Sequence, residues 1–412
     1  MGGESAVTLF LCGDVMLGRG VDQVLPHPGD PTLWEEHVGD ARAYVALAEA
    51  AHGPVPRPAA PSWPWGVALP LLDEAAPGVR VVNLETSVTR RGAPEPGKAV
   101  HYRMTPENLP SLAAARPDVC VLANNHVLDF GRRGLLDTLD ALAAAGLRTA
   151  GAGRDLAGAR RPAAVPLPGP DGGRRVLVFA CGMPSSGVPE AWAAAPGRPG
   201  VDLVPAATEA AAGAVVRRVR RARRPGDLVV VSVHWGSNWG YGVPEGQVRF
   251  AHALVDGGVD VVHGHSSHHP RPLEVYRGKL VLYGCGDLVD DYEGITGYEE
   301  YRDDLRLLYL AALEPDTGRL AALRMAPLRA RRLRLEHASD AERDWLRATL
   351  DRVSRGFGVR VVAESRERGG MLRAAPVRPR SGAVRAGPSR RPPERGRSRT
   401  ATERTRNTTF RS

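Results

Sequence analysis

Long hydrophobic runs are absent from this sequence of 412 residues. The first apolar stretch, Val7–Cys12, is much shorter than the roughly 20 apolar residues that cross a bilayer as a helix. No basic segment precedes it, as one would in a secretory leader. We therefore expect neither a signal peptide nor a transmembrane segment, and we expect a cytoplasmic protein.

Cysteine is also scarce, with four residues far apart in the chain: Cys12, Cys120, Cys181 and Cys285. Each is embedded in an apolar run, a pattern that excludes a disulfide framework and favours a reducing compartment. Two interpretations remain open. The cysteines are small buried hydrophobic residues, or they cluster at one edge of a sheet, since each lies near the end of a predicted strand.

Excess charge is missing from most of the chain and is concentrated at its C-terminal end. The net charge is +9, but residues 373–412 contain 12 arginines against Glu394 and Glu403, so this segment carries +10 and the rest sums to −1. Because residues 370–412 are mostly Arg, Pro, Ser and Gly, we predict a disordered tail there. The tail either solubilises the protein or makes weak, salt-dependent contact with nucleic acid or another anionic surface.

Short apolar runs that suit buried strands alternate with amphipathic segments. The runs are 6–12, 79–84, 118–123, 175–181, 227–233 and 259–262, and helical patterns cover 67–76, 105–116, 134–145, 208–224, 247–255 and 339–353. Two later hairpins, 273–283 and 307–328, add antiparallel strands. This order predicts a mixed α/β fold with one main domain over 1–335, a C-terminal helix and extension over 336–369, and the tail.

The stretch Val259–Pro270 concentrates four histidines: His263, His265, His268 and His269. A short buried strand that ends in a loop with several imidazoles is a common metal-binding arrangement. We expect Gly264 to allow a tight turn that directs His265 and His268 the same way. The alternative is a surface loop that happens to be rich in histidine.

In five places a predicted strand runs directly into residues that can bind a metal. These residues are Asp14, Glu85, Asn125, His234, His265 and His268. Ligands of open α/β sheets gather at the carboxyl ends of strands, so we expect these side chains to meet at one site. Oxygen and imidazole donors without thiolate suit Zn, Mn or Fe. Because six candidates exceed the needs of one tetrahedral ion, we predict two divalent transition metal ions that activate water for attack.

Five segments contain the candidate ligands: GDVML (Gly13–Leu17), NLETSVT (Asn83–Thr89), ANNHVLDFG (Ala123–Gly131), HWG (His234–Gly236) and GHSSHHPRPLEVYRGK (Gly264–Lys279). They resemble motifs of the CapA family, which is known for poly-γ-glutamate capsule synthesis proteins. The resemblance covers roughly residues 7–291, in order. It implies the fold of the calcineurin-like metallophosphoesterases, a four-layer α/β/β/α sandwich in which two mixed sheets pack face to face with helices outside.

The resemblance also implies a role for each candidate ligand. By this resemblance, Asp14 binds the first metal and Glu85 bridges the two metals. Asn125 and His234 bind the second metal, and His265 and His268 are divided between the two ions.

His126 resembles the outer-sphere imidazole that contacts the transferred phosphoryl group or protonates the leaving group, and it is the predicted catalytic residue. Two departures from the wider phosphoesterase pattern are present. Met16 stands where those enzymes usually have a histidine ligand, and Glu85 stands where they bridge with aspartate. The first metal is then weakly held or absent, which bears on phosphatase activity more than on family membership.

Four further residues are candidates for contact with substrate: Asn124, Arg103, Trp235 and Asp287. Arg103 can grip an anion. Trp235 follows a predicted ligand and either walls a substrate cleft or packs its loop down. Asp287 follows the second hairpin strand and either reaches the site or caps that strand.

Two hypotheses for the function follow. The first is a metal-dependent hydrolase of CapA type that acts on a phosphoester or a similar anionic substrate, either a small molecule or a polymer. The second is a non-hydrolytic component that binds polymer or partner proteins during polyglutamate or capsule assembly.

Overall fold

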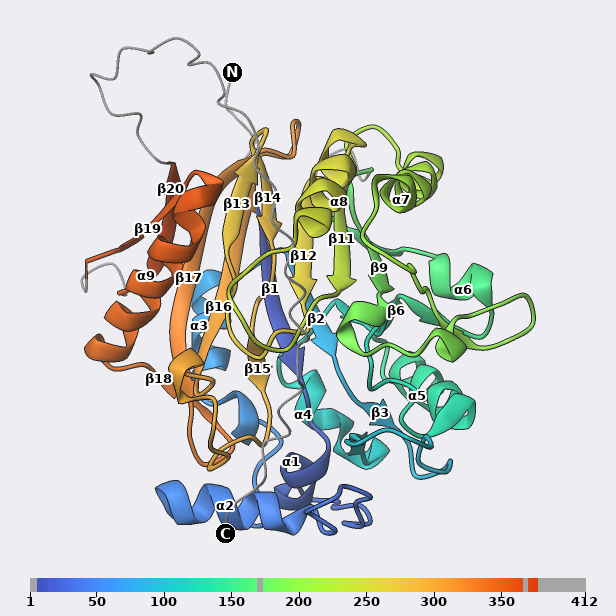
Figure 1. Ribbon diagram of the computed structural model, residues 1–412, viewed down its shortest axis with the longest axis vertical. Coiled ribbons are helices and arrows are strands. Elements are labelled where there is room, and N and C mark those ends of the chain that lie inside the picture. Colours follow the sequence, from blue (N-terminus) through green and yellow to red (C-terminus); the bar gives the residue numbers. More distant parts are fainter. Residues whose placement is uncertain (1–5, 169–172, 366–369, 377–412) are drawn as a thin grey trace, which may run out of the picture. The chain divides into compact units, whose positions relative to one another are not determined.

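Two large β-sheets lie at the centre of the computed structural model, which describes residues 6–168, 173–365 and 370–376 (Figure 1). Over these residues the first sheet has ten strands: β19 (Val359–Ala363), β20 (Leu372–Pro376), β17 (Leu320–Ala330), β16 (Leu305–Leu313), β1 (Val7–Val15), β2 (Val79–Leu84), β5 (Val119–Val121) and β6 (Arg148–Ala150), with β15 (Asp287–Val289) on β1 and β18 (Leu335–His337) on β17. The second sheet has six described strands: β13 (Leu273–Tyr276), β14 (Lys279–Leu282), β12 (Val261–His265), β11 (Leu228–His234), β9 (Arg175–Gly182) and β8 (Ala163–Pro166).

Each of the two sheets contains a run of four parallel strands. Strands β1, β2, β5 and β6 run parallel in the first sheet, and β9, β11, β12 and β14 run parallel in the second. All six residues of β2 are buried, as expected for a strand that is covered on both faces. The two predicted hairpins are confirmed, because β13 pairs antiparallel with β14 and β16 pairs antiparallel with β17.

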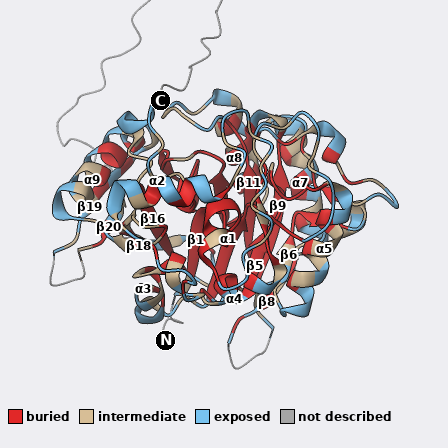
Figure 2. Cartoon of the chain, turned by 90° about the horizontal axis from the view of Figure 1, so that it is seen from below, coloured by how far each residue is buried: buried red, intermediate tan, exposed pale blue. Residues whose placement is uncertain are grey.

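Helices α7 (Glu209–Ala222) and α8 (Glu245–Asp256) cover one face of the second sheet. Successive residues of β11 point to opposite faces, so Val231 packs with these helices whereas Val230 packs with the first sheet. Figure 2 shows the buried strands enclosed by helices whose outer faces are exposed. The predicted mixed α/β class is therefore confirmed.

The other helices precede, follow or connect strands of the first sheet. They are α1 (Arg19–Val24), α2 (Arg42–His52), α3 (Ala68–Ala75), α4 (Leu109–Ala113), α5 (Gly131–Ala144), α6 (Leu156–Arg160) and α9 (Asp340–Ser354). Leu72 of α3, Leu112 of α4 and Leu135 of α5 belong to the same apolar core as the strands of the first sheet. Two small pairs complete the fold: β3 (Ser87–Val88) with β4 (Arg103–Met104), and β7 (Ala152–Gly153) with β10 (Gly200–Val201).

The C-terminal part of the described chain belongs to the first sheet. Strand β20 pairs antiparallel with both β19 and β17. The prediction of a disordered tail is therefore wrong for residues 372–376, because backbone pairing orders a segment that has few core-forming side chains. The rest of that predicted tail, 377–412, lies outside the described residues. The predicted domain boundary at residue 335 falls within β18, so residues on both sides of it share one sheet.

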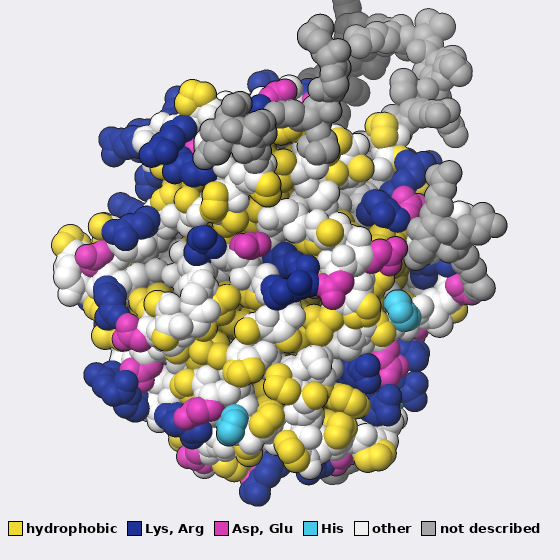
Figure 3. Space-filling view, turned by 180° about the vertical axis from the view of Figure 1, so that it is seen from behind, with side chains coloured by type: hydrophobic (Ala, Val, Ile, Leu, Met, Phe, Trp, Pro, Cys, Tyr) yellow, Lys and Arg dark blue, Asp and Glu magenta, His cyan; other side chains and the backbone are white. Residues whose placement is uncertain are grey.

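Three expectations from composition concern the described surface and core. None of the helices in the described ranges is long and apolar enough to cross a membrane. The four cysteines are buried and unpaired. On the face shown in Figure 3, basic and acidic side chains are interspersed. This mixture agrees with the near-neutral charge of the chain before residue 373.

Candidate metal centre

The strand ends that were predicted to carry metal ligands meet at one edge of the two sheets (Figure 1). His234 ends β11 and His265 ends β12, and the two are register partners in these neighbouring parallel strands. In the first sheet, Asp14 of β1 is the register partner of Asp287 of β15. His265 Nδ1 lies 3.8 Å from Asp14 Oδ1, so donors from both sheets face one another.

A glycine allows Asp14 to reach this position. A Cβ atom at Gly13 would lie 1.5 Å from the carbonyl oxygen of Gly286, which no side chain can tolerate. The missing side chain lets the backbone N–H of Asp14 donate to that carbonyl at 3.2 Å. This close approach brings the end of β1 beside β15, and it places the carboxylates of Asp14 and Asp287 next to each other.

The first group of potential ligands consists of Asp14, His234 and His265, whose donor atoms lie within 4.8 Å of one another. The two Nδ1 atoms of the histidines are 2.7 Å apart. Ser232 Oγ lies 2.8 Å from His265 Nε2 and fixes the orientation of that ring. Burial lowers the pKa of both histidines well below the usual range, so both rings stay neutral, the form that binds metals.

The second group consists of Asp14, His268 and Asp287, again within 4.8 Å. His268 Nδ1 lies 3.0 Å from Asp287 Oδ2. Burial and the neighbouring charge of Asp287 raise the pKa of Asp14 to about 7. Asp14 is the one carboxylate that belongs to both of these groups. The resemblance had implied that Glu85 bridges the two metals. Asp287, expected to contact substrate or cap a strand, lies among the potential ligands.

Glu85 and Asn125 flank His234 on the opposite side of its ring. His234 Nε2 is 2.9 Å from Asn125 Oδ1 and 3.7 Å from Glu85 Oε1. The side-chain amide of Asn83 donates to Asp14 Oδ1 at 2.7 Å and to Glu85 Oε2 at 2.9 Å. The structure thus brings together all six residues that the sequence predicted as metal ligands.

This donor set fits divalent transition metal ions. Burial and the charge of Asp14 raise the pKa of Glu85 well above its usual range, because these buried carboxylates repel one another. A bound cation relieves that repulsion. Carboxylate and imidazole donors without thiolate match Mn, Fe or Zn.

A cavity of about 260 Å³ opens beside these groups. It is lined by Glu85, Lys98, Ala99, Val100, Asn125, His126, Gly187, His234, Asn238, Ser266, His268 and Tyr292. His126 Nδ1 donates to Asp129 Oδ2 at 2.6 Å, and His126 Nε2 lies 4.0 Å from Glu85 Oε1. Burial lowers the pKa of His126 to about 4, so the ring is neutral at pH 7 and its unprotonated nitrogen is Nε2. The predicted catalytic histidine therefore lines the cavity beside a predicted ligand.

Trp235 lies away from this cavity, in the core. Its neighbour His234 points to the metal side, and Trp235 points to the opposite face because side chains alternate along a strand. The indole is 1% exposed, donates to the carbonyl oxygen of Tyr283 at 3.1 Å and packs edge-on against Phe250 of α8. The expected contact with substrate is therefore corrected: Trp235 packs its segment down.

Two other substrate candidates have structural partners. Asn124 is fully buried, where its amide donates to Asn83 Oδ1 and the Leu84 carbonyl, and its Oδ1 accepts from the backbone of residues 126 and 127. Arg103 lies over the ring of Phe130 at 4.4 Å and pairs with Asp30 at 3.8 Å. Neither residue is among those that line the described cavity, and their contact with substrate stays a prediction.

The histidine segment itself differs from expectation in one detail. Gly264 lies within β12, and a Cβ there would come within 2.5 Å of the Leu282 carbonyl oxygen, so this glycine serves close strand packing and makes no turn. The turn comes at Ser266, whose φ is +100° and whose N–H donates to Asp14 Oδ2 at 3.2 Å. His263 joins the two sheets, because its Nε2 donates to the Cys12 carbonyl oxygen at 2.7 Å.

Sequence reasoning did not single out Lys98 and Tyr292, two polar residues of the cavity wall. Both come from loops that connect strands, where no apolar run or spacing singles out a residue. Asp129 was also missed as the partner of His126, although it lies three residues further on in the motif Ala123–Gly131. A polar residue three positions after a predicted catalytic histidine was the available signal.

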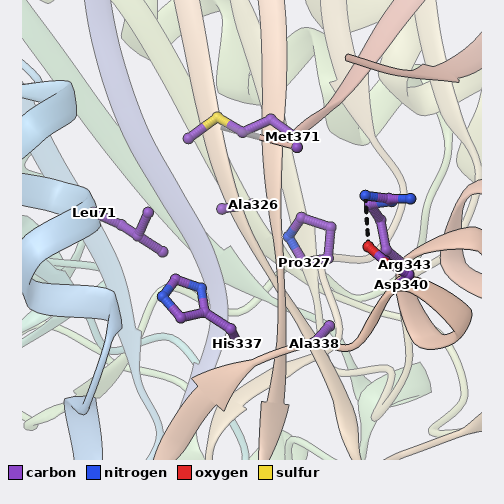
Figure 4. A pocket seen from close by; sticks show the side chains of 9 residues that line it. Leu71, Ala326, Pro327, His337, Ala338, Asp340, Arg343 and Met371 are labelled. Carbon is purple, nitrogen blue, oxygen red and sulfur yellow. Dashed lines mark ion pairs between the residues drawn. The ribbon is translucent and has the colours of Figure 1, made fainter. Parts of the chain in front are cut away.

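A second hollow of about 280 Å³ lies elsewhere, between α3, β17, β18, the start of α9 and residues 370–371 (Figure 4). Leu71, Pro327 and Met371 line it, together with the ion pair of Arg343 and Asp340 at 3.0 Å. It shares no residue with the two groups of potential ligands. The chemistry predicted from the sequence therefore belongs to the cavity beside Asp14.

Comparison with known proteins identifies a family for most of the chain. The family described as "Bacterial capsule synthesis protein PGA_cap" matches residues 8–292, a range that contains every potential ligand named above. The chain belongs to this family of capsule synthesis proteins, and the resemblance to CapA is confirmed.

Individual relatives extend the match. A probable polyglutamine synthesis accessory protein of Mycobacterium tuberculosis is 55% identical over 363 residues, which cover 88% of this chain and 94% of that protein. The PGA biosynthesis protein CapA of Bacillus subtilis is 27% identical over 310 residues, or 74% of this chain and 68% of that protein. A solved structure of TT1561 from Thermus thermophilus has a TM-score of 0.35 and 10% identity, covering 77% of this chain and 97% of that one.

Proposed function

We propose that this chain is a metal-dependent hydrolase that acts on a phosphoester or a similar anionic substrate during the synthesis of a capsule or polyglutamate polymer. The observation that carries the proposal is the pair of ligand groups that share Asp14 and open onto a cavity containing His126. Two sheets with a common core and helices outside also suit a four-layer α/β/β/α sandwich of the metallophosphoesterase type.

The residues that would hold two ions follow from these groups. Asp14, His234 and His265 would hold one ion, and Asp14, His268 and Asp287 would hold the other. Asn125 and Glu85, on the other side of the His234 ring, would supply further oxygen donors. Such ions would polarise the scissile group and stabilise the negative charge that develops on it.

Asp287 is a candidate for the metal ligand that Met16 does not supply. The sulfur of Met16 is buried and accepts from the Tyr292 hydroxyl at 3.9 Å, so it supplies no hard donor to either group. Asp287 is held in register with Asp14 and supplies a carboxylate at the same edge. We infer that a carboxylate from β15 replaces the histidine that the wider superfamily carries near the first aspartate.

His126 would act as the general base and general acid of the reaction. Because its Nδ1 donates to Asp129, its unprotonated Nε2 faces the side where Glu85 lies. A neutral imidazole in this state can take a proton from the attacking water and give it to the leaving group.

The proposal is tested by elemental analysis of protein purified without chelators, together with assays on 4-nitrophenyl phosphate and bis(4-nitrophenyl) phosphate. We expect two divalent ions per chain, and Asn125→Ala and His265→Ala should each lower kcat/KM by more than roughly a hundredfold. His337→Ala, an exposed histidine at the other hollow, is the matched control and should keep full activity. Full activity of both site variants, with the fold intact, would exclude the hydrolase.

A second candidate is a non-hydrolytic role in polymer assembly. It is favoured by the word "accessory" in the description of the mycobacterial relative, whose length this chain matches almost completely. Protein that binds no metal and hydrolyses neither model ester, yet retains polyglutamate in a binding assay, would support this candidate over the first.

A further inference from the structure

The ammonium group of Lys98 lies in the wall of the cavity. It comes from the loop between β3 and β4, and its side chain is 16% exposed. The ammonium donates to the backbone carbonyl oxygen of Asn125 and to Asp129 Oδ1. Among the described residues that line the cavity, Lys98 is the only lysine or arginine.

One of the three N–H bonds of the Lys98 ammonium group has no acceptor among its hydrogen-bond partners. An ammonium group has three N–H bonds, and two of them are used by Asn125 and Asp129. The remaining neighbour is His126 Nδ1 at 3.3 Å. That nitrogen carries its own hydrogen, because it donates to Asp129 Oδ2 at 2.6 Å, and it therefore cannot accept from Lys98.

The loop that carries Lys98 is held in place before any ligand arrives. The backbone N–H of Glu95 donates to the Asp129 carbonyl oxygen at 2.8 Å, and Glu95 Oε1 accepts from the Trp192 indole at 3.1 Å. The ammonium also lies 5.1 Å from the centre of the Trp192 ring. A donor that is fixed in this way loses little conformational entropy when it binds an anion.

We propose that Lys98 recognises the substrate, by donating its third hydrogen to a negatively charged oxygen of a phosphate or carboxylate group bound in the cavity. This inference rests on the proposed function and specifies its substrate: the group next to the scissile bond, or the scissile group itself, carries an anionic oxygen. The side chains of its neighbours Ala99 and Val100, which also line the cavity, carry no hydrogen-bond donor.

The chain provides a matched control, because it contains only one other lysine, Lys279. Lys279 also donates to a buried aspartate, Asp260, and to the Thr317 carbonyl oxygen, and its side chain is likewise 16% exposed. It begins β14, which runs parallel to β12, so it lies at the end of the sheet opposite to His265. Lys279 thus matches Lys98 in charge, burial and type of partner, but it lies away from the cavity.

The first experiment measures binding without relying on activity. Reductive methylation with limiting formaldehyde, followed by peptide mass spectrometry, reports how fast each lysine reacts with and without inorganic phosphate or acetate. We expect phosphate to slow modification of Lys98 by roughly tenfold in metal-loaded protein, while Lys279 is unaffected, because a charge-assisted hydrogen bond occupies the ammonium. Protection by acetate instead identifies a carboxylate as the anion. Equal rates at Lys98 with and without both anions would overturn the inference.

The second experiment uses Lys98→Met, Lys98→Arg and Lys279→Met. Lys98→Met should raise both KM for 4-nitrophenyl phosphate and the inhibition constant of phosphate by roughly ten- to a hundredfold, with metal content unchanged. Lys98→Arg keeps the charge and the bonds to Asp129, so it should recover most of the affinity and remains informative if the methionine variant unfolds. Lys279→Met should match the wild type. An unchanged KM and inhibition constant in folded Lys98→Met would refute the role of Lys98.

The two proposals fail in different ways. A wild-type protein that hydrolyses neither ester refutes the proposed function, while the methylation assay still decides whether Lys98 binds an anion. A wild-type protein that hydrolyses the esters with Lys98 unprotected refutes the role of Lys98 alone.

Discussion

The close contact between Gly13 and Gly286 gives the sharpest prediction about how the site is built. Replacing Gly13 with alanine puts a methyl group 1.5 Å from the Gly286 carbonyl oxygen. An ordinary contact between such atoms is about 3.5 Å, so the two backbones must separate by roughly 2 Å. No side-chain rotation relieves this overlap, because the atom that is struck belongs to the backbone.

The cost of Gly13→Ala has two parts. Separation breaks the hydrogen bond from Asp14 N to Gly286 O, which contributes about 1 kcal/mol. Forcing an extra methyl group into a packed region costs about 1–3 kcal/mol more. We therefore expect the free energy of unfolding to fall by about 2–4 kcal/mol. The same displacement moves Asp14 away from Asp287, so the affinity for metal should fall as well.

Urea unfolding followed by circular dichroism measures the first effect, and metal titration of the chelator-treated protein measures the second. Gly39→Ala is the control, since a Cβ at Gly39 has no neighbour within 4 Å and its φ is not positive. The reasoning is refuted if Gly13→Ala unfolds within about 0.5 kcal/mol of the Gly39→Ala control and binds metal normally.

Three further predictions concern single residues. Asp287→Asn should lower the metal content from two ions to one, as measured by elemental analysis, because the second group loses a carboxylate. Trp235→Phe should lower the free energy of unfolding by about 1–2 kcal/mol, because the hydrogen bond to the Tyr283 carbonyl oxygen is lost. The KM of the folded variant should stay unchanged. Burial lowers the pKa of His263 to about 4, so the unfolded chain binds a proton below pH 6.5 that the folded protein excludes. The stability of the wild type relative to His263→Gln should therefore fall as the pH drops from 6.5 to 4, by up to about 3 kcal/mol in urea titrations.

Each of these has a contrary outcome. Two ions retained by Asp287→Asn would remove Asp287 from the ligand set. A KM increase without loss of stability in Trp235→Phe would return the indole to the substrate side. A stability difference for His263→Gln that is flat between pH 4 and 6.5 would show that His263 is hydrated or protonated in the folded protein.

The sequence alone was sufficient to find most of the potential metal ligands. Apolar runs predict buried strands, and parallel strands of a sheet end at a common edge, so a polar residue directly after each run is placed there by the covalent chain. Asp14, Glu85, Asn125, His234 and His265 all obey this rule, and the structure brings them together. The mixed α/β class follows from the same alternation of apolar runs and amphipathic segments.

The direction of individual side chains and the long-range contacts needed the tertiary structure. Trp235 follows a ligand in sequence but points into the opposite core, since neighbours on a strand face opposite ways. Strand β20 is ordered by pairing with β17 and β19, which its own composition does not indicate. Pairing energy comes from partners that lie far away in the chain, and no local pattern reports it.

What the sequence determined by itself is therefore the set of donors that local strand patterns deliver to one edge. Tertiary structure decided which carboxylate the two ligand groups share, that Asp287 joins them, and that Lys98 faces the cavity. The physical reason is that a strand end is placed by its own few residues. A loop residue such as Lys98 is placed only by the contacts that its loop makes with the rest of the fold.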